Sequence, residues 1–94
     1  MWWLEECPIP GDQGLVGALV TEGTVILMCD SCGTVWCTPD KVGTDDYSQP
    51  GPDDDFATQC GVRVTESAHW ADRAEIDRAG WGDLAWKEYT DEDG

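Results

Sequence analysis

Three cysteines in the first third of the chain have the residue type and spacing needed to bind a metal ion. Cys29 and Cys32 are separated by two residues and are followed by Gly33. Two thiolates at this spacing can bind one ion from a single tight turn, and glycine lets the backbone approach the sulfurs without a clash at Cβ. Cys7 begins a second segment of the same outline, but Pro10 stands where its second thiol would be. These residues predict a tetrahedral zinc site that lacks one obvious ligand.

Cys37 is the first candidate for the missing ligand, because it follows the Cys29–Cys32 turn closely. Cys60 and His69 are alternatives from beyond a long loop. A metal-free domain held together by packing is a further alternative. If the chain meets oxidising conditions, Cys37 and Cys60 form a disulfide instead, which would contribute about 3 kcal/mol by the loop-entropy model.

A β-hairpin is expected to position these cysteines. Residues 15–21 and 24–28 are rich in β-branched and aliphatic side chains, and Glu22-Gly23 between them is typical of a tight turn. The second run leads directly into Cys29. Residues 34–37 are then expected to leave the turn as a third strand.

Residues 7–33 resemble a zinc ribbon, in which two Cys-x-x-Cys-Gly turns at the tips of hairpins share one metal ion. The resemblance covers about a third of the chain. It implies that Cys7, Cys29 and Cys32 occupy three of the four ligand positions. The fourth position falls on Pro10, which cannot bind metal.

The rest of the chain predicts a single domain, residues 1–94, of the α+β class. A ribbon-like antiparallel β-sheet (1–37) precedes a long acidic loop (38–59), and residues 60–94 hold a strand, a helix and an acidic tail. The strand is expected at 61–65 and the helix at 71–80, with Ser67 or Asp72 as the N-cap and Gly80 after its end. Residues 83–89 are expected to form a last strand or turn, before the tail at 90–94.

The charge of the chain limits its partners. Twenty acidic and five basic side chains give a net charge of −15. Such a chain repels nucleic-acid phosphates and anionic membranes, and it favours a basic protein partner. An acidic proteome is the simpler explanation of the same charge. We expect a cytoplasmic location, because no apolar run approaches membrane-spanning length and the first residues lack the basic region of a signal peptide.

The sequence predicts a protein that is not an enzyme. The carboxylates are too numerous for their spacing to indicate catalysis, and His69 is the only histidine. Redox Cys-x-x-Cys motifs usually open a helix, whereas residues after Cys32 predict a strand. No phosphate-binding glycine loop or nucleophile elbow is present in the sequence.

The leading functional hypothesis is an acidic binding protein that neutralises a basic protein. In size and charge the chain resembles immunity proteins, which block nuclease toxins. Two alternatives are an inhibitor of a defence nuclease that mimics DNA, encoded by a phage or mobile element, and a zinc-ribbon adaptor in a larger complex. The expected contact residues are acidic or aromatic: Asp45, Asp46, Asp53, Asp54, Asp55, Phe56, Trp81 and Trp86.

Overall fold

A small antiparallel β-sheet with one short helix forms the protein, in a computed structural model that describes residues 1–89. Strands β4, β3, β2, β1 and β6 lie side by side in that order, and β5 also pairs with β2. This confirms the predicted α+β class. The strands are β1 (Trp2–Glu6), β2 (Leu15–Thr21), β3 (Thr24–Cys29), β4 (Val35–Trp36), β5 (His69–Trp70) and β6 (Lys87–Glu88).

The predicted hairpin is confirmed as β2 and β3. Glu22 and Gly23 connect the two strands with φ of 51° and 77°. Two successive left-handed residues match the twist of the strands they join, which is why such turns are favoured in two-residue hairpins. The register pairs Val16 with Cys29, so the hairpin fixes Cys29 at the end of β3.

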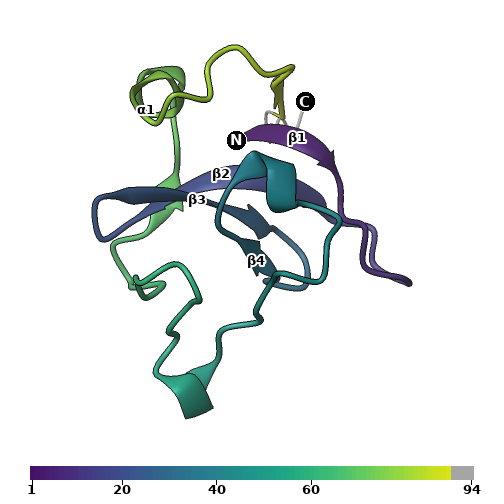
Figure 1. The fold of residues 1–94 in the computed structure, drawn as a ribbon, viewed down its shortest axis with the longest axis vertical. Helices are drawn as coiled ribbons and strands as arrows, with labels where there is room; N and C mark the ends of the chain where they lie inside the picture. The colour runs from purple at the N-terminus through teal and green to yellow at the C-terminus, as the bar shows by residue number, and fades with distance from the viewer. Residues whose placement is uncertain (90–94) are drawn as a thin grey trace, which may run out of the picture.

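Strand β1 is absent from the elements that the sequence predicts. It pairs antiparallel with β2 on one side and with β6 on the other, and its register shifts between Trp3 and Glu5. Figure 1 shows β1 beside β2. The register shift breaks the regular alternation of side chains, which is the main signal of a strand in a sequence.

The strand predicted at residues 61–65 is wrong; the structure has β5 at His69–Trp70 instead. The main chain of residues 61–65 bonds to the side chains of Thr21 and Glu22 and to the main chain of residues 56–58. The Thr21 hydroxyl donates to the carbonyl of Arg63 at 2.6 Å and accepts from the amide of Thr65 at 3.2 Å. These bonds satisfy polar groups that a strand ladder would otherwise satisfy.

The predicted helix is confirmed as α1 (Arg73–Arg78). Asp72 is its N-cap: its carboxylate accepts from the amide of Glu75, whose own carboxylate accepts from the amide of Asp72. Gly80 follows the helix with φ of 86°. Ile76 is fully buried and packs with residues of β2, and this holds the helix against the sheet. Figure 1 shows α1 on the opposite side of the sheet from residues 50–60.

The buried core lies mainly on β2, β3 and β4. Trp36 is its largest fully buried side chain, and the other five tryptophans are half-buried. One cluster of the core includes two cysteines among its buried residues: Cys7, Val16, Leu27, Cys29 and Trp36. Two candidate metal ligands therefore belong to the core itself. Within residues 1–89, no helix is long and apolar enough to cross a membrane.

Candidate metal centre and acidic loop

Four side chains, those of Cys7, Asp12, Cys29 and Cys32, bring one ligand atom each to a common centre. These atoms all lie within 4.8 Å of one another. The Cys7 and Cys32 sulfurs are 3.7 Å apart. A tetrahedral ion with Zn–S bonds of about 2.3 Å would separate neighbouring sulfurs by roughly 3.8 Å. The group therefore has the size and the donor set of a Cys₃Asp zinc site.

Two loops carry the four residues. Cys7 directly follows β1, and its amide donates to the carbonyl of Gly14 at 2.9 Å, which closes the loop that contains Asp12. Cys29 ends β3, and its carbonyl accepts from the amide of Gly33 at 3.2 Å, which closes the turn that contains Cys32. Gly33 has a φ of 77° that favours glycine.

Gly14 allows the two loops to approach closely. A Cβ at this position would lie 2.6 Å from the sulfur of Cys29 and 2.6 Å from the Cβ of Ser31. Real Cβ atoms do not tolerate such distances, so a larger residue would push the loops apart. The Gly14 amide also donates to the Asp12 carboxylate at 3.0 Å, which orients that side chain toward the sulfurs.

Asp12 supplies the fourth ligand atom of the group. The sequence pattern would place this ligand at Pro10, which cannot bind metal. Oδ2 of Asp12 accepts a hydrogen bond from the Cys29 thiol at 3.1 Å. This bond, with others from Cys7 and Gly14, holds the pKa of Asp12 well below its usual range. Sequence reasoning missed Asp12 because it lies outside the Cys-x-x-Cys spacing and is one of twenty acidic residues.

The pKa of Cys32 shifts in the opposite direction from the pKa values of Cys7 and Cys29. Burial raises the pKa of Cys7 and of Cys29. Burial acts in the same direction on Cys32 and is the largest single effect, but hydrogen bonds with Thr34, Cys29 and Cys7 together outweigh it, and the pKa of Cys32 falls below its ordinary value. Metal binding requires all three thiols to lose their protons, so it would displace the Cys29–Asp12 hydrogen bond.

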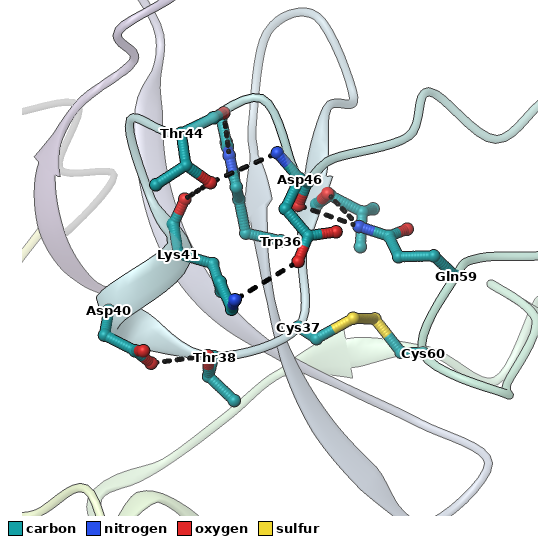
Figure 2. Close-up of polar contacts among 10 residues, drawn as sticks. Trp36, Cys37, Thr38, Asp40, Lys41, Thr44, Asp46, Gln59 and Cys60 are labelled. Carbon is teal, nitrogen blue, oxygen red and sulfur yellow. Dashed lines mark hydrogen bonds and ion pairs between the residues drawn. A yellow bond between two sulfur atoms is a disulfide. The ribbon is translucent and has the colours of Figure 1, made fainter.

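Cys37, predicted as the fourth ligand, lies elsewhere. It forms a disulfide with Cys60, with their Cα atoms 5.4 Å apart. The chain leaves β4 at Cys37 and returns beside it at Cys60, so the two thiols meet each other instead of the cluster (Figure 2). This confirms the disulfide alternative. His69, the third alternative ligand, is exposed and pairs with Glu75 at 3.0 Å.

The disulfide spans the acidic loop, residues 38–59, which also contains two short 3₁₀ turns, Pro39–Lys41 and Pro52–Asp54. The Gln59 amide donates to the carbonyls of Val35 and Asp46 at 3.0 and 3.3 Å, and Thr44 accepts from the buried Trp36 indole at 3.4 Å (Figure 2). The loop is thus bonded to the sheet at several points along its length.

The expected contact residues fall into two groups. Lys41 pairs with Asp46 at 3.4 Å and Arg63 pairs with Asp55 at 2.9 Å. The remaining carboxylates of the set are exposed and form no ion pair within residues 1–89: Asp45, Asp53 and Asp54.

The expected aromatic contacts also divide. Phe56 is 43% exposed, and a second aromatic of the loop, Tyr47, is 41% exposed. Trp81 and Trp86 are half-buried and pack against the core, and the Trp86 indole donates to the carbonyl of Trp81 at 2.8 Å. Most of their surface is therefore used within the fold, and Phe56 is the more accessible contact.

Comparisons with protein-family models, with curated proteins and with solved structures find no match to this chain.

Proposed function

We propose that this chain is a zinc-stabilised, non-catalytic binding domain. The observation that carries the proposal is the cluster of Cys7, Asp12, Cys29 and Cys32, whose ligand atoms lie within 4.8 Å of one another. Three thiolates favour zinc over hard cations such as Mg²⁺ or Ca²⁺, and four protein ligands are typical of structural zinc sites. The two turns around the metal resemble a zinc ribbon, with Asp12 supplying the ligand that Pro10 cannot.

The zinc site is tested by native mass spectrometry of protein purified without added metal or chelator. We expect a mass increment of one zinc ion that is lost in acid. Cys29→Ser should lower both zinc occupancy and the melting temperature, because structural zinc binding contributes directly to folding. Pro10→Ala is a matched control in the same loop, at an exposed position outside the cluster. A metal-free wild-type protein with three free thiols would refute the site.

The binding partner we propose is a basic protein, and an immunity protein against a nuclease toxin is the specific form of the proposal. Asp45, Asp53 and Asp54 support it, because they are exposed carboxylates without an ion pair in the described residues. Electrostatic attraction of this kind accelerates association with an oppositely charged surface.

Phe56 supplies a second feature of this surface. Asp55 and Phe56 both have left-handed backbone conformations, with φ of 55° and 57°. An aromatic residue rarely adopts this conformation, and such residues concentrate at functional sites. A surface hollow of about 520 Å³ beside Phe56 is also lined by Asp55, Arg63 and Glu66, and Arg63 pairs with Asp55. An exposed aromatic ring in the same hollow as Glu66 suits the cationic side chain of a basic partner.

The partner is tested with the protein encoded by the neighbouring gene, which an immunity protein should neutralise. We expect co-expression to restore growth, and Asp45→Asn/Asp53→Asn/Asp54→Asn to slow association at low salt. The matched control, Glu5→Gln/Glu6→Gln/Glu88→Gln, removes the same charge from β1 and β6. Equal association rates for both triple variants would exclude the loop as the contact surface. Binding to a phage-encoded or host nuclease instead would favour the DNA-mimic alternative.

A cytoplasmic location remains part of the proposal, and the disulfide makes it testable. Disulfides persist mainly in oxidising compartments, and cytosolic thiols are usually kept reduced. Rapid alkylation of the protein in intact cells would distinguish the two states of Cys37 and Cys60. Modified thiols at both positions would support the cytoplasm, and protected thiols would place the protein in an oxidising environment.

A further inference from the structure

A buried hydroxyl group connects the metal cluster to the acidic loop. The sulfur of Cys32 lies 3.1 Å from Oγ1 of Thr34, and the side-chain amide of Gln49 donates to the same oxygen at 2.9 Å. Thr34 is fully buried, whereas Gln49 is exposed and belongs to the loop. One continuous chain of hydrogen bonds therefore joins a metal ligand to the loop that carries the exposed carboxylates.

The backbone beside Gln49 keeps this side chain in place. The amide of Val35 donates to the carbonyl of Ser48 at 2.8 Å, and the amide of Ser48 donates to the carbonyl of Val35 at 3.1 Å. Val35 follows Thr34, and Gln49 follows Ser48, so this bridge sets the two side chains next to each other. None of these backbone bonds involves a metal ligand.

The hydroxyl of Thr34 can serve both of its neighbours, Gln49 and Cys32, at once. A threonine hydroxyl has one proton to donate and two lone pairs to accept with. Gln49 fills one lone pair of Thr34, so the hydroxyl proton remains free to point at the sulfur. A metal-bound cysteine is a thiolate, which only accepts, and a hydrogen bond to a charged acceptor is stronger than one to a neutral group.

With metal bound, both hydrogen bonds therefore run in the same direction: Gln49 donates to Thr34, and Thr34 donates to the thiolate of Cys32. Hydrogen bonds in such a series polarise and strengthen one another. Metal would also fix the position of the Cys32 sulfur, and through the 3.1 Å contact that of the Thr34 hydroxyl. Through Thr34, this constraint would extend to the Gln49 side chain, whose nitrogen lies 2.9 Å from the same oxygen.

We propose that Thr34 and Gln49 form an outer shell of the metal site that couples metal binding to the order of the acidic loop. The inference rests on the proposed zinc site and extends it to two residues that do not bind the metal. Because coupling between two sites is reciprocal, a partner that orders the loop would also raise the affinity for zinc.

The test combines two measurements on the full chain. Zinc affinity is measured by competition with a chromophoric chelator, and hydrogen exchange of the amides of residues 45–56 is followed with and without zinc. In the wild type we expect zinc to slow exchange in this segment. Thr34→Val should weaken zinc binding about tenfold or more, as is typical when an outer-shell partner is lost, and should remove the zinc-dependent protection. Thr34→Ser, which keeps the hydroxyl, should restore both.

Gln49→Ala provides an independent test, because its exposed position leaves the fold unaffected. It should remove the zinc-dependent protection with a smaller loss of affinity than Thr34→Val. If either variant binds zinc normally and still shows full zinc-dependent protection of the loop, the coupling is refuted and the zinc site stands. If the wild type binds no zinc, the proposed function fails first.

Discussion

Loss of the Cys37–Cys60 disulfide should remove a large part of the protein's stability. The disulfide closes a loop with a sequence separation of 23 residues. The loop-entropy model gives a contribution of about 3 kcal/mol for a loop of this length. A domain of this size has a total free energy of unfolding of roughly 5–14 kcal/mol. The double variant Cys37→Ala/Cys60→Ala should therefore remain folded, with a much smaller free energy of unfolding.

The native contacts of the loop should survive this change. Gln59 still donates to the carbonyl of Val35 at 3.0 Å, and Val35 still pairs with Ser48. The loss should therefore arise mainly from the greater freedom of the unfolded chain. At roughly 4–8 °C per kcal/mol for a domain of this size, the melting temperature should fall by about 12–24 °C.

Urea and thermal unfolding, followed by tryptophan fluorescence with saturating zinc, measure this loss. A phosphine reductant should destabilise the wild type to a similar extent and leave the double variant unchanged. A loss below about 1 kcal/mol would refute the reasoning, because the disulfide would then place little constraint on the unfolded chain. An equally large effect of reductant on the double variant would show that the metal site is the sensitive element.

Two further predictions concern the metal loops and the helix. Gly14→Ala would place a Cβ 2.6 Å from the sulfur of Cys29, so its zinc affinity, measured by chelator competition, should fall sharply. Gly51→Ala is the control: its Cβ would have open space around it, and this variant should bind zinc as the wild type does. The hydrogen bond to Glu75 raises the pKa of His69, so the stability from this pair should be full below the unfolded pKa of about 6.5 and decline as the pH rises through the folded pKa. Urea unfolding of His69→Gln across this range should lack that decline, and an unchanged pH profile would contradict the pairing.

The hairpin and the helix could be predicted because their signals are local. Glu22 and Gly23 lie between two β-rich runs, and Asp72 begins a capping box that ends three residues later. Each signal involves neighbours in the sequence, and the structure preserves both. The Cys29–Cys32 turn was predicted for the same reason.

The fourth member of the cluster could not be predicted, because its position depends on contacts between distant segments. Asp12 reaches Cys29 only after β1 and β2 pair and Gly14 allows the two loops to approach. The role of Cys37 depends in the same way on the return of the chain at Cys60. The disulfide between Cys37 and Cys60 was one of the alternatives predicted from the sequence, and the structure has this disulfide.

The order of the cysteines along the chain has a consequence for assembly. All four members of the metal cluster lie within the first 32 residues, whereas Cys60 is synthesised much later. During vectorial synthesis on the ribosome, the proposed zinc site can therefore form before Cys60 emerges. Zinc would then protect three of the five thiols from oxidation and leave Cys37 and Cys60 as the sole pair available. Early metal binding at the proposed site would in this way prevent disulfides between the wrong cysteines.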